Sequence, residues 1–154
     1  MTRPEIAYSV QTLSQFLQDP KHTHMEATLR IVKYLKQQPV KEVLLSSNGS
    51  LLMTAYCDAD RASCPMSRRS VTGYLIKLGN SLITWKSKKQ INVSRSSTES
   101  EYRSLATTLS EIIWLSGLLK ELEWNSISLW KSIVIAKQQC RLLSILFTMK
   151  GPST

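Results

Sequence analysis

Two pairs of carboxylates in this 154-residue chain enclose a long stretch that has no acidic residue. Asp58 and Asp60 end the apolar run "LLMTAYCDAD", and Glu99 and Glu101 belong to "SSTESEYRSLA". Cleavage of a phosphodiester by two metal ions requires several carboxylates that converge on Mg²⁺ ions about 3.5–4 Å apart. Because Mg²⁺ prefers oxygen ligands, a strand Asp and a helix Glu are suitable donors. The two pairs are therefore candidate ligands for a hard cation.

The stretch between the two pairs is strongly basic. From position 61 to position 95 it carries eight Lys and Arg residues, and the whole chain has a net charge of +9. Such an excess predicts attraction to polyanions, either nucleic acid or an acidic membrane surface. The alternative for each single residue is an ordinary solvated charge. The candidate phosphate contacts are Arg68, Arg69, Lys86, Lys88, Lys89 and Arg95.

Other features limit the class of protein. No apolar run reaches the roughly 18 residues that a membrane span needs, and no segment has the pattern of a signal peptide. Cys57, Cys64 and Cys140 fit neither a zinc pair nor a disulfide framework. We expect reduced thiols and an intracellular, non-secreted protein, in a compartment that the sequence does not specify. His22 and His24 stand where a helix should begin, so helix entry is preferred over a metal role.

The N-terminal part predicts two helices within residues 3–37, with Thr2 and Pro4 at the first N-cap and first turn. Apolar residues recur there at helical spacing. The two predicted stripes are Ile6, Val10, Leu13 and Leu17, and Met25, Leu29, Val32 and Leu35.

The central part predicts strands over 41–47, 51–60, 71–79 and 81–88, followed by a long helix over 96–124. Strands followed by a long helix indicate an α+β fold. In the strand 51–60, the even-numbered residues, Asp58 among them, should share one face. The predicted helix stripe is Tyr102, Leu105, Leu109, Ile112 and Ile113, and Gly117 is a candidate break.

Several motifs closely resemble the Pol polyprotein of copia-type LTR retrotransposons. They are "TRPEIAYSVQTLSQFLQDP", "RIVKYLKQQP", "YCDAD", "RRSVTGYLIKLGNSLITWKSKKQ" and "SRSSTESEYRSLATTLSEIIWL", and together they cover about residues 2–124. The resemblance implies the helical end of a reverse transcriptase over residues 1–40. It implies part of an RNase H-like domain, a mixed sheet with a long helix, over residues 41–125. Residues 126–154 would be an aberrant tail.

The resemblance also implies an activity and its site. Such domains cleave the RNA strand of an RNA–DNA hybrid with Mg²⁺, so the expected partner is a hybrid or other nucleic acid, with no membrane and no small-molecule substrate. Asp58 resembles the family's first metal ligand and Glu101 its second. Asp60 and Glu99 would lie beside the metal. The alternative for Glu101 is a capping box with Thr98.

This chain departs from the family in two places. The family usually has "DADWAG" where this chain has "DADRAS", so Arg61 replaces Trp and Ser63 replaces Gly. The segment "SLWKSIVIAKQQCRLLSILFTMKGPST" contains no acidic residue, although the family has a fourth strand there whose Asp supplies a third carboxylate.

A change of reading frame explains the second departure. With suitable third bases, "SIVIAKQQ" read one base back becomes "YCDSKAA", and "TMKGPST" becomes "HERTKH", both motifs of the family. We infer a frameshift near Trp130. The alternative is a divergent tail that forms another apolar element.

The expected function is therefore that of a degenerate reverse transcriptase/RNase H fragment. Its ancestral hybrid-directed RNA cleavage should be lost or severely reduced, because the third carboxylate is missing. One alternative is a non-catalytic, basic nucleic-acid-binding module. Another is a decayed element without a cellular role.

Overall fold

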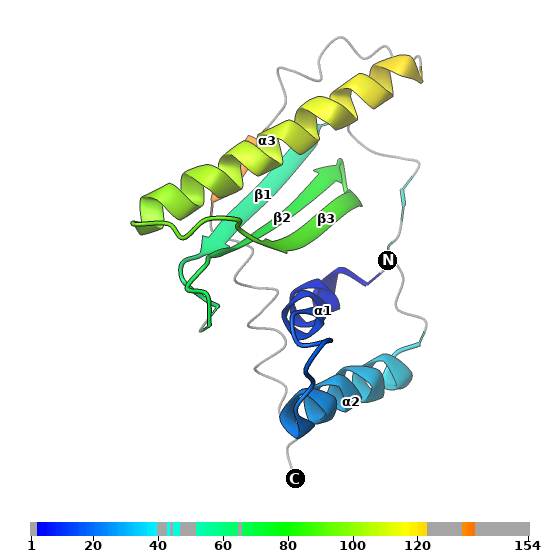
Figure 1. Cartoon of the computed structure of the whole chain (residues 1–154). Helices are drawn as coiled ribbons and strands as arrows, with labels where there is room; N and C mark the ends of the chain where they lie inside the picture. Colours follow the sequence, from blue (N-terminus) through cyan, green and yellow to red (C-terminus); the bar gives the residue numbers. More distant parts are fainter. Residues whose placement is uncertain are drawn as a thin grey trace.

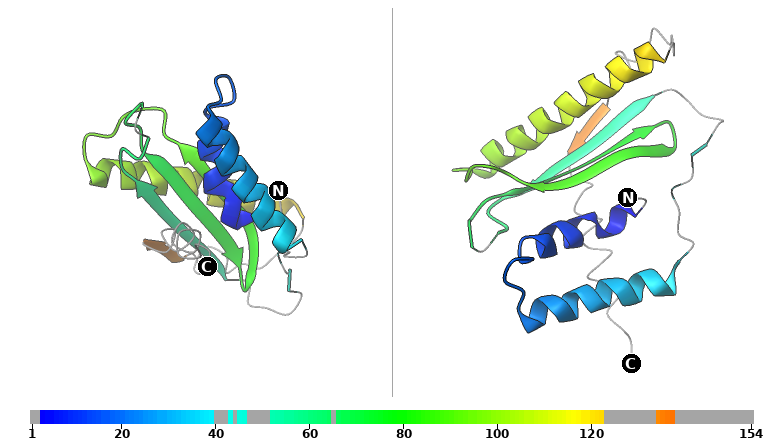
Figure 2. Two further views of the ribbon diagram at one scale, coloured as in Figure 1. Left: turned by 90° about the horizontal axis from the view of Figure 1, so that it is seen from below. Right: turned by 45° about the vertical axis from the view of Figure 1, so that its right-hand side comes forward.

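A computed structural model describes residues 3–39, 43, 45–46, 52–64, 66–122 and 134–137, the last four by backbone alone. Helices and strands are packed in layers, which confirms the α+β prediction. Helix α3 (Ser97–Glu121) covers one face of a sheet, and helix α1 (Ala7–Ser14) lies on the other face (Figure 1). Helix α2 (His22–Gln37) lies beyond α1, and the further views show the same layering (Figure 2).

The sheet has four strands in the order β3-β2-β1-β4. Strands β1 (Met53–Asp60), β2 (Val71–Leu78) and β3 (Ser81–Lys89) form an antiparallel meander. Strand β4 (Val134–Lys137) pairs with β1 in parallel. The sheet is therefore mixed, and the three predicted strands over 51–60, 71–79 and 81–88 are confirmed.

Strand β1 divides its side chains between the two faces of the sheet, as alternation requires. Met53, Ala55 and Cys57 are buried in the core together with Ile112 of α3. Asp58 belongs to the other set, so its side chain lies on the face that points away from α3. The predicted division of this strand is confirmed.

Helix α3 contacts the sheet with small residues. Its buried positions are Ser100, Ser104, Thr108, Ile112, Leu115 and Ser116. The predicted stripe was wrong at three positions, because Tyr102, Leu109 and Ile113 are exposed. Small side chains let the helix backbone approach the sheet closely, and their hydroxyls donate to carbonyls, as Thr108 Oγ1 does to the Ser104 oxygen at 2.9 Å.

The predicted break of this helix at Gly117 was also wrong, since α3 runs through it to Glu121. A Cβ built at Gly117 would meet no atom within 4 Å. This glycine is therefore neither a turn nor a point of close packing.

The N-terminal helices form a hairpin tied at both ends. Arg3 Nη1 donates to the Gln38 oxygen at 2.7 Å, and the rings of Phe16 and His24 stack with centroids 4.0 Å apart. The predicted helix-entry role of the histidines is confirmed for His24, whose Nδ1 accepts from Lys21 N at 3.1 Å. The first turn is a 3₁₀ helix, Pro4–Ile6, whose N-cap is Arg3 rather than the predicted Thr2, which lies outside the described residues.

The predicted apolar stripe of α2 is not buried. Met25, Leu29 and Val32 are exposed, and Ile31 is the buried residue of this helix. The physical reason is position: α2 lies beyond α1 and does not reach the sheet, so most of its surface has no described neighbour to pack against (Figure 1). Leu17 of the first stripe lies past the end of α1 and is exposed as well.

The strand predicted over 41–47 is not observed. Of that stretch only residues 43, 45 and 46 are described, and none of them belongs to a strand. Cys57 and Cys64 are buried and form no disulfide in the described part of the chain, while Cys140 lies outside the described residues. Among the described residues, no helix has the length and apolar character needed to cross a membrane.

Candidate nucleic-acid and metal site

Asp58 lies at the junction of β1 with α3. Its backbone oxygen accepts a hydrogen bond from Ser104 Oγ at 2.8 Å, which fastens α3 to this point of the strand. Its side chain lies on the opposite face, in the row that contains Gly73 of β2 and Ser87 of β3. The strand continues past Asp58 to Asp60, which is exposed at its end.

Glu101 is half-buried on α3, one turn before Ser104. It does not serve as the capping residue of this helix, so the capping box with Thr98 was wrong. The N-cap is Ser96, whose Oγ accepts from Glu99 N at 3.0 Å. The helix begins two residues earlier than a Thr98 cap would require, and the capping role falls to Glu99.

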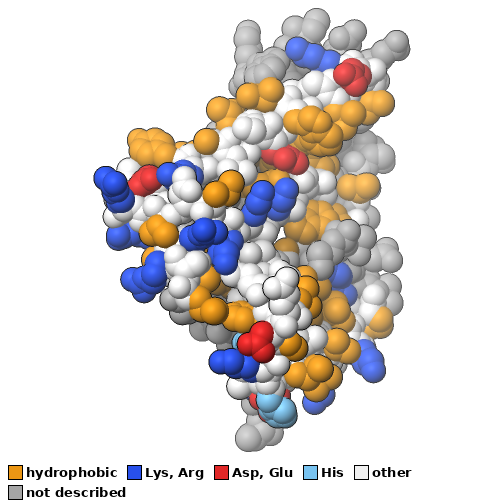
Figure 3. Space-filling model, in the orientation of Figure 1, with side chains coloured by type: hydrophobic (Ala, Val, Ile, Leu, Met, Phe, Trp, Pro, Cys, Tyr) orange, Lys and Arg blue, Asp and Glu red, His pale blue; other side chains and the backbone are white. Residues whose placement is uncertain are grey.

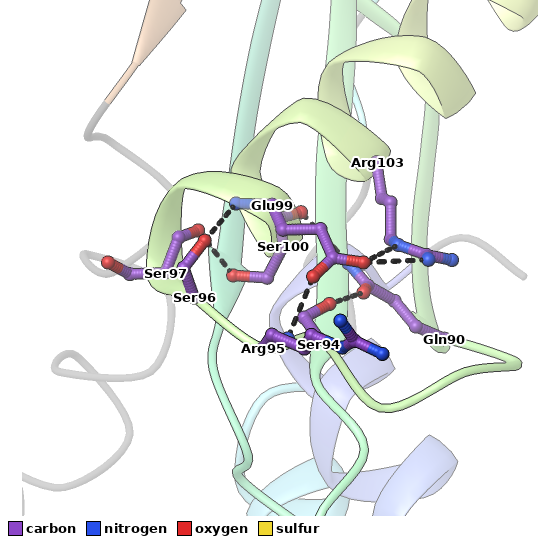
Figure 4. Close-up of polar contacts among 8 residues, drawn as sticks. All are labelled: Gln90, Ser94, Arg95, Ser96, Ser97, Glu99, Ser100 and Arg103. Atoms are coloured by element: carbon purple, nitrogen blue, oxygen red, sulfur yellow. Dashed lines mark hydrogen bonds and ion pairs between the residues drawn. The ribbon is translucent and has the colours of Figure 1, made fainter.

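Glu99 is held by the backbone before the helix and by one arginine. Its Oε2 accepts from Arg95 N at 2.7 Å, and its Oε1 accepts from Arg103 Nη2 at 2.8 Å (Figure 4). The Arg95 N–H and then the Arg103 guanidinium stabilise the charged carboxylate, and together they lower the pKa of Glu99 below its usual value. Both oxygens of Glu99 thus have partners within the protein.

The described residues do not fit a pair of Mg²⁺ ions. Asp58 and Glu101 are oxygen donors of the right type. However, no group of three or more His, Cys, Asp or Glu side chains is gathered to hold a metal in the described part of the chain. The Asp58 side chain lies on the sheet face away from α3, which carries Glu101. Asp58 and Glu101 remain predicted ligands.

The sheet separates the predicted phosphate contacts into two groups. Lys86 and Lys88 pair with Tyr74 and Thr72, so they lie on the α3 side of edge strand β3, and both are exposed. On the other side, Lys89 Nζ donates to Oε1 of Gln15, the C-cap residue of α1, at 2.6 Å. Lys89 therefore links the helical hairpin to the sheet.

The other three predicted phosphate contacts lie in the loop before β2 and in the loop before α3. They are Arg68, Arg69 and Arg95, and all three are exposed. Lys and Arg side chains gather around the N-terminal end of α3 in the space-filling view (Figure 3). A polyanion at this end of the molecule would meet several cations at once.

Sequence reasoning missed two arginines of this group. Arg61 Nη2 donates to the Arg95 oxygen at 2.7 Å, which joins the β1–β2 loop to the loop before α3. Arg103 joins the same place through Glu99. Arg103 escaped notice because Glu99 and Glu101 separate it from the acid-free stretch, although its i,i+4 spacing from Glu99 on a predicted helix was a usable signal.

The loop that departs from the family motif is strained. Ala62 adopts a left-handed conformation with φ 52°, a region that favours glycine. The Ser63 hydroxyl oxygen is buried and has no hydrogen-bond partner among the described residues. Both features lie directly after Arg61, where the chain departs from the family motif.

Comparisons with curated proteins give the class of this chain. A retrovirus-related Pol polyprotein from transposon RE1 of Arabidopsis thaliana is 46% identical over 121 residues, which is 79% of this chain and 8% of that protein. The Pol polyprotein from transposon TNT 1-94 of Nicotiana tabacum is 39% identical over 121 residues, 79% of this chain and 9% of that protein. The secreted RxLR effector protein 161 of Plasmopara viticola is 41% identical over 116 residues, 75% of this chain and 82% of that protein.

The chain therefore belongs to the family of copia-type retrotransposon Pol polyproteins. It spans less than a tenth of the length of the Pol polyproteins it matches. No family model matches the sequence, and no solved structure is significantly similar to it.

Proposed function

We propose that this chain is an RNase H-like segment of a retrotransposon Pol polyprotein that binds nucleic acid and has lost most of its RNA cleavage. Its ancestral activity is Mg²⁺-dependent cleavage of RNA in RNA–DNA hybrids. The proposal rests on one observation above the others, the position and sequence of β4.

Strand β4 lies parallel to β1, with Tyr56 beside Ala136 and Cys57 beside Lys137. This is where the resemblance expects a fourth strand with the third carboxylate, next to the strand that carries Asp58. The sequence of β4 is VIAK and contains no acid. A change of reading frame before this strand would replace its sequence, and that would account for the absence of an acid in VIAK.

The order of the elements supports the same proposal. A strand with Asp58, a hairpin, and a long helix with Glu101 near its start follow one another as in the RNase H fold that the resemblance implies. The bond between Ser104 Oγ and the Asp58 backbone oxygen ties α3 to β1 beside this residue.

Loss of a carboxylate should affect the rate strongly. Catalytic groups that act as a unit are not additive, and removing one commonly costs about 10³-fold or more. Nucleic-acid binding depends on the basic residues instead, so it should persist.

The test is a Mg²⁺-dependent cleavage assay on an RNA–DNA hybrid with the full chain. The Asp58→Asn variant is the matched control, because it removes one predicted ligand and keeps the shape of the side chain. We expect both proteins to bind the hybrid with an affinity that falls as salt rises, and neither to cleave above background. Steady turnover that disappears in the Asp58→Asn variant would show that the site is active. A salt-independent affinity would count against the binding part of the proposal.

A further inference from the structure

Three arginines from three different segments converge at the start of α3. Arg61 comes from the β1–β2 loop, Arg95 from the loop after β3, and Arg103 from α3 itself. Three contacts connect them: Arg61 Nη2 donates to the Arg95 oxygen at 2.7 Å, Arg95 N donates to Glu99 Oε2 at 2.7 Å, and Arg103 Nη2 donates to Glu99 Oε1 at 2.8 Å. Since Glu99 is the acid these contacts include, the group carries three positive charges and one negative. We name Arg61, Arg95 and Arg103 the arginine cluster.

The loop beside this cluster is held firmly. Gln90 Nε2 donates to the Ser100 oxygen at 3.0 Å, Ser94 Oγ donates to Gln90 Oε1 at 3.0 Å, and Arg95 N donates to Glu99 (Figure 4). Both ends of the short segment between Gln90 and Arg95 are thus tied to α3 or to each other. The side chains of this segment therefore have a defined position relative to α3.

Apolar surface is exposed among these charges. Ile91 and Val93, on the tied segment, are 75% and 52% exposed. Tyr102 is next to Arg103 on α3 and is 65% exposed. Tyr102 is also one turn from Glu99, which puts its ring on the same side of the helix as the contact with Arg103. This end of the molecule therefore exposes one aromatic ring and two aliphatic side chains as well as arginines.

A duplex does not explain this surface, because paired bases hide their faces and offer mainly phosphates. An unpaired strand offers both phosphates for the arginines and base faces for the ring. We infer that the arginine cluster and Tyr102 form a binding site for an unpaired nucleic-acid strand, with a base stacked on Tyr102. This inference rests on the proposed nucleic-acid binding and adds the class of ligand and the residue that recognises it.

The two contributions have different signatures. Stacking of a base on an aromatic ring is nearly independent of salt, whereas each phosphate contact adds to the salt dependence. Tyr102→Ala should therefore lower the affinity without changing the slope of log affinity against log salt. Arg95→Ala should lower the affinity and reduce that slope by about 0.7 for a single strand.

The experiment compares a blunt RNA–DNA hybrid with the same hybrid carrying a short unpaired extension, each bound to the full chain over a range of salt. We expect the extension to tighten binding, and Tyr102→Ala to weaken binding of the extended hybrid by about 5- to 100-fold while leaving the blunt hybrid unchanged. Tyr102→Phe should bind like the original chain. Trp114→Ala is the matched control: Trp114 is a 60% exposed aromatic of the same helix, about 18 Å farther along its axis.

The outcomes separate this inference from the proposed function. If the blunt hybrid binds but the extension or Tyr102→Ala has no effect, the stacking site is wrong and the proposed binding stands. If Trp114→Ala weakens binding as much as Tyr102→Ala, the effect is not local and the inference fails. If neither nucleic acid binds, both are wrong. A circular dichroism spectrum unchanged by Tyr102→Ala excludes loss of α3 as the cause.

Discussion

Glu99 shows how one carboxylate can fix the start of a helix to the loop before it. It accepts from Arg95 N and from Arg103, and Ser96 caps the same turn of α3. Because Ser96 is the N-cap, the acid of the capping interaction is Glu99, and Glu101, two residues later, takes no part in it. The sequence pattern pointed to Thr98 and Glu101 instead, since the choice depends on which serine or threonine begins the helix.

The lowered pKa of Glu99 predicts a pH dependence of stability. A carboxyl whose pKa is lower in the folded chain stabilises the fold above its unfolded pKa, about 4.3 for Glu, and that contribution is lost as the pH falls through the folded pKa. We expect the free energy of unfolding to decrease on acidification through this range. The Glu99→Gln variant should show a smaller decrease, measured by urea denaturation at several pH values.

The control for this prediction is Arg103→Met, which removes the second contact and keeps the first and larger one, with Arg95 N. It should reduce the acid dependence less than Glu99→Gln does. An acid dependence that is identical in the original chain and in Glu99→Gln would contradict the role of this carboxylate.

Among the helices and strands, α3 is the one whose buried face differs most from the prediction. Its existence and its start near residue 97 were predictable from helical spacing and capping residues. Its buried face was not, because apolar periodicity favoured Tyr102, Leu109 and Ile113. The buried face of α3 consists mostly of serines and a threonine, which a hydrophobicity pattern does not identify as core residues.

This packing predicts an unusual pair of mutational effects. Ser104 is buried, and Leu109 is exposed on the same helix. Ser104→Leu should lower the free energy of unfolding by about 1–3 kcal/mol, because the extra volume must push α3 away from β1. Leu109→Ser should change it by no more than about 0.5 kcal/mol. Chemical denaturation of both variants measures the two values.

The reverse order, with Leu109→Ser the more damaging, would mean that the predicted stripe is the true core of α3. Ser104→Ala separates volume from hydrogen bonding. It keeps the small size and loses only the bond to the Asp58 oxygen, so it should cost less than Ser104→Leu.

At the scale of the whole molecule, the strands β1, β2 and β3 were predictable because alternation and turn residues are local signals. The pairing of β4 with β1 was predictable only through the family, since parallel neighbours are distant in sequence. The arginine cluster was not predictable as a unit. It joins residues 61, 95 and 103, and three-dimensional contacts alone bring them together.

The length over which this chain matches its relatives bears on the proposed change of reading frame. The match with the RE1 polyprotein covers 121 residues, which is nearly the length of the region 2–124 on which the resemblance rests. Beyond this region lies β4, which pairs with β1 in parallel and contains no acid. We propose a single change of reading frame near Trp130 as the cause of both facts. It would leave the basic residues in place and remove the third carboxylate that the resemblance implies.

The nucleotide sequence of the gene across the codons for residues 125–154, and past the stop, tests this claim most directly. We predict that the frame one base back spells "YCD" at the codons of β4 and "HERTKH" farther on, and that it stays open. If that frame spells neither motif, the tail is the chain's own divergent sequence, and the proposed cause of the lost carboxylate is wrong.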